Sequence, residues 1–270
     1  MPETSSLDPL DGPRFAFGTL TVIPVRVHRW DRVAARGGML CAPLAGLAVG
    51  VAAAGLGLSL LLLGAGPLLA AVGSVAVPAA LTRGLHLDGL ADTADGLGSG
   101  KPAEEALAIM KRSDIGPFGV LTLVLTLLAQ VAALAGLYAD SWARGALGAV
   151  VSAVAARLAL TVAARTGVPA ARPEGLGAAV AGVVPVPGAL AVAAAVTLAA
   201  GAAGALLGPW EAVRTAAAVP LCLVPAELLL RRCAQRFGGV TGDVFGALAE
   251  SAATAALLVL CLGGPGPLGG

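Results

Sequence analysis

Three aspartates stand close together in residues 83–96 of an otherwise apolar chain. Asp88, Asp92 and Asp95 are four and three residues apart, so on a helix turning about 100° per residue their carboxylates fall within an arc of roughly 60°. Apolar residues then occupy the opposite face. Like charges at this spacing repel each other, and a divalent cation would offset the repulsion. Carboxylates are the ligands that Mg²⁺ or Mn²⁺ prefers, so the pattern predicts a helical metal site; the alternative is a solvated helix face.

A basic segment follows that acidic one. Lys111 and Arg112 come shortly before a helix that we expect to begin near Pro117, and the first N–H groups of such a helix attract phosphate. Ser113 or Asp114 is expected to cap this helix through its side chain. The segment therefore predicts a phosphate-binding helix start. The alternative is an ordinary cap with positive charges beside the membrane.

Two loops could complete the site. Residues 238–246 form a glycine-rich turn that includes Gly242 and Asp243, and glycines leave backbone N–H groups open to a phosphate. Asp243 would add a fourth carboxylate, although the turn lacks the Gly-Lys-Ser/Thr of a Walker loop. The loop at 172–177 offers Arg172 and Glu174. Taken alone, each loop fits a plain flexible turn better than a binding site.

Four more ionisable residues are expected to support the site from behind. On a continuous helix His86 lies roughly 160° from Asp88, so either it is a packing or supporting residue or the helix begins after it, and it is not taken as the general base. Arg157, Glu227 and Glu250 fall inside apolar segments. A charge at the centre of a bilayer costs at least about 2.5 kcal/mol, so such residues face a bundle interior or a wet cavity; for Glu227, reaching to the interface is the alternative.

The amino-acid composition predicts a membrane protein. Of 270 residues 57% are hydrophobic and only 12% are charged, and apolar runs of about 18 residues recur. Because the apolar mass is mainly small residues, an all-α polytopic bundle fits better than a barrel. We expect about seven spans. They are predicted at residues 39–63, 67–81, 118–138, 143–164, 184–207, 212–230 and 245–262.

Charge asymmetry predicts the orientation. With residues 1–38 as a cytoplasmic N-terminal segment, fourteen of the 17 Lys and Arg residues fall on the cytoplasmic side. That segment begins with a polar tail and continues in an interfacial or re-entrant run at 15–25. Residues 39–270 then form one transmembrane domain in the inner or plasma membrane. The acidic motif at 83–117 and the loops at 165–182 and 231–243 all lie on the cytoplasmic side.

Other features exclude partners or chemistry. The net charge of +1 predicts no nucleic-acid partner. The four cysteines have no metal-binding spacing, and no cleavable signal peptide is visible. The lipid bilayer is the expected partner, and a homo-oligomer is left open. Carboxylates, phosphate-suited helix starts and arginines together fit phosphoryl transfer at a membrane surface.

Several motifs in order resemble one family over most of the chain. They are Gly-Leu-His-Leu-Asp-Gly-Leu-Ala-Asp-Thr-Ala-Asp-Gly at 84–96, Ile-Met at 109–110 with Ile-Gly-Pro-Phe-Gly at 115–119, Glu-Gly-Leu-Gly at 174–177, and Gly-Val-Thr-Gly-Asp at 239–243 with Glu250. The chain resembles the cobalamin synthases, or adenosylcobinamide-GDP ribazoletransferases. That family often has Asp-Ser-Arg where this chain has Arg112, Ser113 and Asp114, so here the two charges are exchanged.

The resemblance implies a Mg²⁺-dependent late step of vitamin B12 assembly, with Mn²⁺ as an alternative ion. Adenosylcobinamide-GDP would couple to α-ribazole or its 5′-phosphate, releasing GMP and forming adenosylcobalamin or its 5′-phosphate. The aspartates of the acidic motif, joined by Asp243, would hold the metal and carry catalysis. Substrate and phosphate binding would fall to Lys111, Arg112, Ser113, Asp114, Arg172, Glu174 and Gly242.

Two other classes compete with this interpretation. A lipid-type CDP-alcohol phosphotransferase also uses aspartates on a membrane helix, but that family has Ala-Arg where Asp92-Thr93 follows the first Asp-Gly here. A cation transporter would place its acidic residues near the membrane midplane, whereas this cluster is expected in a helix close to a loop.

Overall fold

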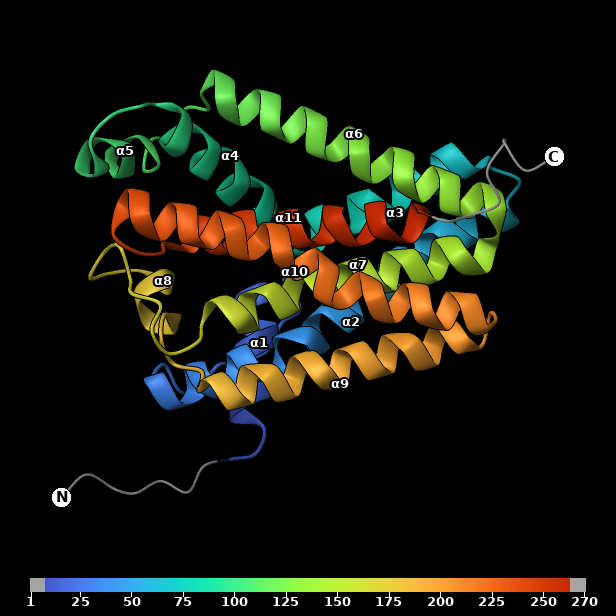
Figure 1. Cartoon of the computed structure of the whole chain (residues 1–270), viewed down its shortest axis with the longest axis horizontal. Coiled ribbons are helices and arrows are strands. Elements are labelled where there is room, and N and C mark those ends of the chain that lie inside the picture. The colour runs from blue at the N-terminus through green and yellow to red at the C-terminus, as the bar shows by residue number, and fades with distance from the viewer. Residues whose placement is uncertain (1–7, 263–270) are drawn as a thin grey trace.

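A computed structural model describes residues 8–262, and this part of the chain is built from helices without a β-strand (Figure 1). Six helices are long and apolar enough to cross a membrane, and a bent pair, Pro67–Leu81 with Leu85–Gly98, passes the same test only when counted as one span. The prediction of an all-α bundle with about seven spans is confirmed. The helices are α1 (Asp11–Leu20), α2 (Arg32–Leu62), α3 (Pro67–Leu81), α4 (Leu85–Gly98), α5 (Ala103–Ile109), α6 (Pro117–Asp140), α7 (Trp142–Ala163), α8 (Leu176–Val180), α9 (Val186–Ala205), α10 (Pro209–Phe237) and α11 (Gly242–Cys261).

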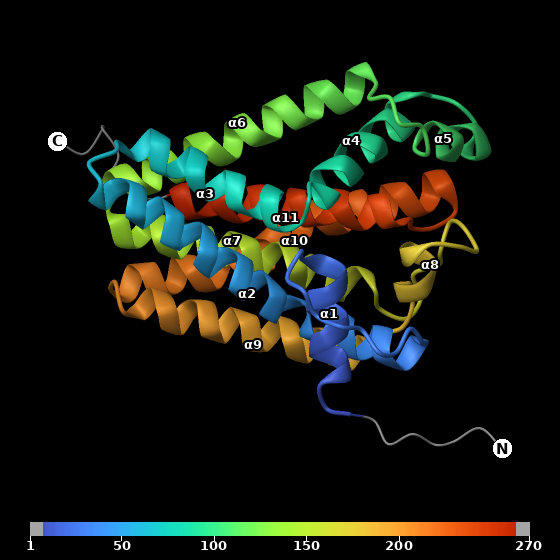
Figure 2. The same ribbon diagram turned by 180° about the vertical axis from the view of Figure 1, so that it is seen from behind.

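The six long helices run lengthwise, and three of the short ones lie together at one end. α4, α5 and α8 lie at the left end in Figure 1 and at the right end in Figure 2, which we call the site end. The turns from α6 to α7 and from α9 to α10 lie at the opposite end, the far end. α7 and α11 pack against each other in the interior, and α9 covers one side. All the motif-bearing segments therefore meet at one end, as expected.

Small residues let the central helices approach closely. α2 and α7 form an extensive contact. A Cβ atom on Gly46 of α2 would come within 2.5 Å of the Ala153 carbonyl oxygen of α7, so only hydrogen fits there. Van der Waals contact between backbones is the main force that joins helices in lipid, which explains the Ala- and Gly-rich composition.

The chain turns sharply between α3 and α4. The two helices are bent by 87° relative to each other, and the turn places Arg83 at φ +54° and Gly84 at φ +71°. Glycine adopts this left-handed conformation freely, whereas arginine pays for it in strain. α4 then lies beside the first turn of α11, where Gly89 meets Asp243, and beside the last turn of α10. It therefore lies at the end of the spans rather than among them.

Two predicted boundaries are wrong. α2 begins at Arg32, not near residue 39, because the Asp31 side chain accepts hydrogen bonds from the N–H groups of Val33 and Ala34, both at 2.9 Å. The predicted division at residue 38 thus falls inside a helix. α10 continues to Phe237, so most of the loop expected at 231–243 is helical; its apolar run ends earlier, but arginine and glutamine sustain a helix in water.

The N-terminal run at 15–25 is only partly helical. Residues 11–20 form α1, which packs on α2, and its Phe15 and Leu20 are buried in the same hydrophobic core as residues of α7 and α11. α1 is therefore part of the domain rather than a separate segment. The predicted polar tail lies mostly outside the described residues.

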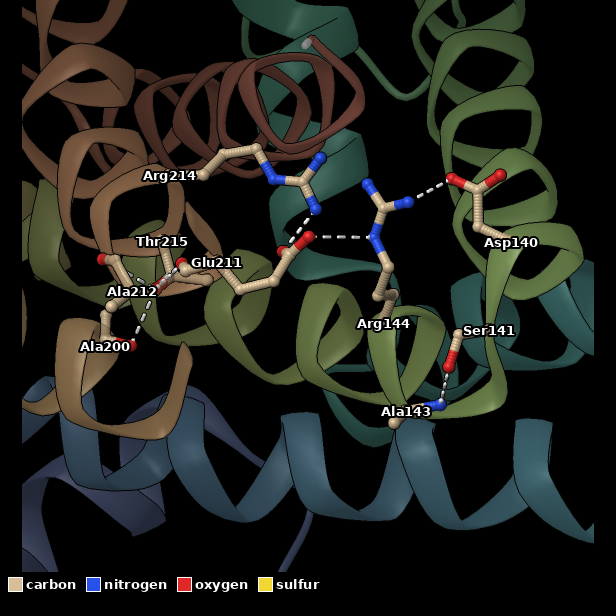
Figure 3. A network of polar contacts seen from close by, with 9 residues as sticks. All are labelled: Asp140, Ser141, Ala143, Arg144, Ala200, Glu211, Ala212, Arg214 and Thr215. Carbon is tan, nitrogen blue, oxygen red and sulfur yellow. Dashed lines mark hydrogen bonds and ion pairs between the residues drawn. The ribbon is translucent and has the colours of Figure 1, made fainter. Parts of the chain in front are cut away.

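Ion pairs tie three helices at the far end (Figure 3). Arg144, near the start of α7, pairs with Asp140 at the end of α6 and lies 3.3 Å from a Glu211 carboxylate oxygen on α10. Glu211 also pairs with Arg214 one turn later. The predicted spans placed both arginines at outer span ends, and here they join the starts of α7 and α10 to the end of α6.

Candidate active site

The three aspartates of α4 meet different surroundings, although the helix itself forms as predicted. Asp88 is exposed, Asp92 is half-buried and Asp95 is buried. α4 packs against α11 along one side and α6 along another, so its C-terminal half is pressed into the protein. The expected stripe of three carboxylates facing water is therefore wrong for Asp95.

Asp95 fixes the start of α6. Its carboxylate accepts hydrogen bonds from the N–H groups of Gly116, at 2.7 Å, and Gly119, at 2.9 Å. A Cβ atom on Gly119 would come within 2.6 Å of that carboxylate, so glycine is required for the approach. The expectation that Ser113 or Asp114 caps α6 is wrong, because a carboxylate from another helix already satisfies those N–H groups.

Asp243 lies about 150 residues after the acidic helix in the sequence, and the fold brings it to that helix. A Cβ atom on Gly89 of α4 would lie 2.6 Å from the Asp243 carbonyl oxygen, so α4 and α11 touch backbone to backbone here. The Thr241 side chain caps α11 and donates a hydrogen bond to the Asp243 carboxylate at 3.1 Å. An Arg172 guanidinium nitrogen lies 3.9 Å from the same carboxylate. The segments that carry Asp88, Asp92 and Asp243 thus touch, with Arg172 beside Asp243.

The acidic cluster is electrostatically unbalanced. Burial, followed by the charges of Asp88, Asp243 and Asp95, raises the pKa of Asp92 to about 7, and Arg172 lowers it only in part. Uncompensated carboxylates are the surroundings that a divalent cation relieves. No group of three or more acidic, His or Cys side chains within residues 8–262 is already arranged for a metal ion. The metal site expected from Asp88, Asp92, Asp95 and Asp243 therefore stays a prediction, and Asp95 is the member whose carboxylate is engaged with α6.

The loop carrying Arg172 is held by the backbone. The Ala171 N–H donates to the Val240 carbonyl oxygen, and the Val240 N–H donates to that of Pro169, both at 2.9 Å. Arg172 also donates a hydrogen bond to the Leu107 carbonyl oxygen near the end of α5. Its guanidinium is therefore fixed between α5 and α11, which orients it toward the acidic cluster.

Two open clefts flank the cluster. The larger, of about 840 Å³, lies between the end of α1, the α3–α4 turn, α4 and the loop before α6. Arg112, Ser113 and Asp114 line it together with Asp88 and Asp92. The smaller, of about 280 Å³, lies between α4, the start of α11 and the loop before α8. Its lining includes Arg172, Glu174, Gly242 and Asp243, again with Asp88.

Of the remaining predicted residues, only His86 lines one of the two clefts. Lys111 is exposed and lines neither of them. His86 is buried, as expected, and lines the smaller cleft, while its Nε2 has no hydrogen-bond partner among the described residues. Arg157 and Glu250 line an internal cavity of about 30 Å³. Glu227 pairs with Arg165 at 2.9 Å and Arg231 at 2.8 Å, on a part of α10 that neither cleft includes.

Sequence reasoning missed several cleft residues. Arg83 lines the larger cleft, and its place directly before a glycine was the available signal for an unusual turn. Thr19 of α1 lines the same cleft. Leu176 and Phe245 line the smaller cleft, and no sequence pattern separates them from ordinary core residues.

Comparisons with known proteins identify the family that the chain is similar to. A family model described as cobalamin-5-phosphate synthase matches residues 12–261. Three relatives, each named adenosylcobinamide-GDP ribazoletransferase, align over most of the chain. The protein of Frankia casuarinae is 42% identical over 94% of this chain and 96% of its own length. The protein of a Nocardioides species is 43% identical over 92% of this chain and 97% of its own length. The protein of Bradyrhizobium diazoefficiens is 39% identical over 91% of this chain and 91% of its own length. No solved structure matches the chain.

Proposed function

This chain belongs to the cobalamin-5-phosphate synthase family, and from that premise we propose that it joins adenosylcobinamide-GDP to α-ribazole or α-ribazole 5′-phosphate. It is a transferase of cobalamin biosynthesis built as a multi-pass membrane protein. The reaction would release GMP and form adenosylcobalamin or its 5′-phosphate. The substrates follow from the names of its relatives and from the chemistry that the site can perform.

One observation carries the proposal: three carboxylates from two distant segments line two adjoining clefts, and an arginine lies beside one of them. Asp88 and Asp92 come from α4, Asp243 from α11, and Arg172 lies 3.9 Å from Asp243. Transfer of a phosphoryl-type group needs two substrates aligned on one phosphorus atom and compensation of phosphate charge. The arrangement supplies both requirements.

The reaction balances with groups that the chain provides. A ribose hydroxyl oxygen of the acceptor would bond to the phosphorus next to the cobinamide, while the bond from that phosphorus to the bridging oxygen breaks and GMP leaves. The proton of the hydroxyl would pass to one of the carboxylates Asp88, Asp92 or Asp243. Arg112 and Arg172, one in each cleft, would neutralise phosphate charge as it develops.

The donor set suits Mg²⁺, and Mn²⁺ would bind in the same way. The carboxylates of Asp88, Asp92 and Asp243 are hard oxygen ligands, and the charges of Asp88 and Asp243 help to raise the pKa of Asp92. These three residues would hold the ion, which would offset the negative charge of the diphosphate when bound. Asp95 is committed to the N–H groups of α6, so we propose that it positions α4 and α6 rather than the metal.

We also propose that the site end faces the cytoplasm of a cell bounded by this inner or plasma membrane, because basic residues concentrate in the segments that form it. Cys261 at the far end and Lys101 at the site end are both exposed. A membrane-impermeant maleimide should label Cys261 in intact cells. Lys101→Cys, in a chain whose Cys261 is replaced by Ser, should react only after permeabilisation. Labelling of Lys101→Cys in intact cells would reverse the orientation.

The function is tested with purified protein in detergent. Adenosylcobinamide-GDP, α-ribazole and Mg²⁺ should yield GMP by chromatography only when all three are present. Asp92→Ala should abolish the release, whereas Asp140→Asn, at the far end, should retain it. Folded protein that releases no GMP would refute the proposal and return a lipid phosphotransferase or a cation transporter to consideration. Uptake of a divalent cation into vesicles would then identify the transporter.

A further inference from the structure

The two clefts share a wall at the acidic helix. Of the residues that line them, only Leu85 and Asp88 line both. Asp92 faces the larger cleft and Asp243 the smaller. The carboxylates therefore mark the boundary between two spaces rather than the floor of one pocket.

We propose that the two substrates enter from opposite sides of Asp88: the smaller cleft holds the ribosyl-benzimidazole acceptor and the larger holds the nucleoside-diphosphate end of the corrinoid donor. This assignment rests on the proposed function. An in-line displacement at phosphorus places the attacking and leaving oxygens on opposite sides of that atom. Two clefts that meet at a carboxylate wall satisfy this requirement, because each can hold one of the two oxygens on its own side of the phosphorus atom.

The volumes assign the substrates to the clefts. Pockets that enclose drug-sized ligands span roughly 300–1,000 Å³. The smaller cleft, at about 280 Å³, lies at the lower limit and suits a single nucleoside. The larger, at about 840 Å³, lies near the upper limit and admits a guanosine diphosphate end, while its open mouth leaves the corrin ring outside.

The linings agree with the volumes. Apart from its polar rim, the smaller cleft is walled by Leu20, Leu160, Leu176 and Phe245, which suit the flat apolar face of a benzimidazole. Its rim carries the acidic side chain of Glu174, and carboxylates accept hydrogen bonds from sugar hydroxyls.

The arginines that line the clefts also distinguish the two substrates. The larger cleft is lined by both Arg83 and Arg112, whereas the smaller cleft has Arg172 alone, and that residue is shared with Asp243. A diphosphate carries more negative charge than the acceptor nucleoside and is bound best where guanidinium groups can pair with its oxygens. The two arginines therefore place the donor in the larger cleft.

Filling each cleft in turn tests the assignment. Leu176→Trp narrows the smaller cleft and Leu123→Trp the larger, because each leucine lines only one of them. Leu128→Trp is the matched control, since Leu128 lies on the same helix as Leu123, is 61% exposed and lines neither cleft. Leu176→Phe and Leu123→Phe are smaller steps in case a tryptophan variant does not fold.

Two-substrate kinetics of GMP release give the readout, with equilibrium dialysis of α-ribazole in the absence of donor as a measurement independent of turnover. Leu176→Trp should raise the KM for α-ribazole at least ~10-fold and weaken its binding equally, with the KM for adenosylcobinamide-GDP unchanged. Leu123→Trp should raise the KM for adenosylcobinamide-GDP and leave the KM and the binding of α-ribazole unchanged. The control Leu128→Trp should change neither KM. A swapped pattern, or one substrate affected by both variants, would overturn the assignment. Absence of GMP release by the unmodified protein would instead refute the proposed function.

Discussion

Replacing Asp95 with asparagine should lower the free energy of unfolding. We do not expect it to remove a metal ligand. The carboxylate accepts two backbone N–H groups at 2.7 and 2.9 Å at the start of α6. Asparagine keeps one oxygen but points an NH₂ group at the second N–H, so one hydrogen bond and the negative charge at the helix start are lost. A charge-assisted hydrogen bond contributes about 1.5–3 kcal/mol, and loss of a helix cap costs about 1 kcal/mol.

These figures describe the same contact, so the expected loss for Asp95→Asn is about 2 kcal/mol. In a chain of this size that corresponds to a fall in Tm of roughly 4–8 °C. The assay is thermal unfolding in detergent, followed by tryptophan fluorescence, without divalent cations. GMP release measured well below Tm should then be reduced much less than in a variant that removes a reacting group.

Asp88→Asn is the matched control, because Asp88 is exposed on the same helix whereas Asp95 is buried. It should keep its Tm and lose GMP release. The reasoning would be refuted if Asp95→Asn kept the parent Tm and lost activity as completely as Asp88→Asn. Asp95 would then act as a metal or substrate ligand, and its contact with α6 would be incidental.

Three further predictions follow from the same geometry. Because burial and nearby carboxylates raise the pKa of Asp92 from 3.8 to about 7, the cation-free protein should lose roughly 1–2 kcal/mol of unfolding free energy as pH rises from about 4 to 7. Thermal unfolding in EDTA should show this loss, and Asp92→Asn or Mg²⁺ should remove it; an equal slope in Asp92→Asn would contradict the assignment. Gly89→Ala should slow GMP release about 10–100-fold, because its methyl group would meet the first turn of α11. Gly136→Ala is the control: the space around its Cβ is open, so it should retain full activity and gain up to about 1 kcal/mol of stability. Arg144→Leu should lower the unfolding free energy by about 1–3 kcal/mol with turnover per folded molecule unchanged, and a loss of turnover would show that the far end influences the site.

Much of the architecture could be predicted from local sequence. A residue's hydropathy and the period of a helix act over a few turns, so the long apolar runs and the helix carrying Asp88 and Asp92 were visible without a structure. The boundary of α10 was not, because the helix outlasts its apolar run where Arg231 pairs with Glu227. The hydropathy of a segment reports burial in lipid, and helices can extend beyond it.

The composition of the site depended on contacts between distant segments. The spacing of Asp95 is the same kind of signal as that of Asp92, yet Asp95 turns inward because α6 presents two N–H groups to it. Asp243 was a candidate from its glycine-rich surroundings, but only the backbone contact at Gly89 brings it to the acidic helix.

The sequence by itself determined the class of molecule, most of the helices and the candidates for reacting groups, since these depend on residue type and short-range period. Tertiary structure alone decided which carboxylates share one space, which of them supports a helix, and that two clefts meet at Asp88. The physical reason is that a cleft is a gap left between packed elements. Its position depends on how α1, α4, α6 and α11 approach one another, and no single segment encodes that distance.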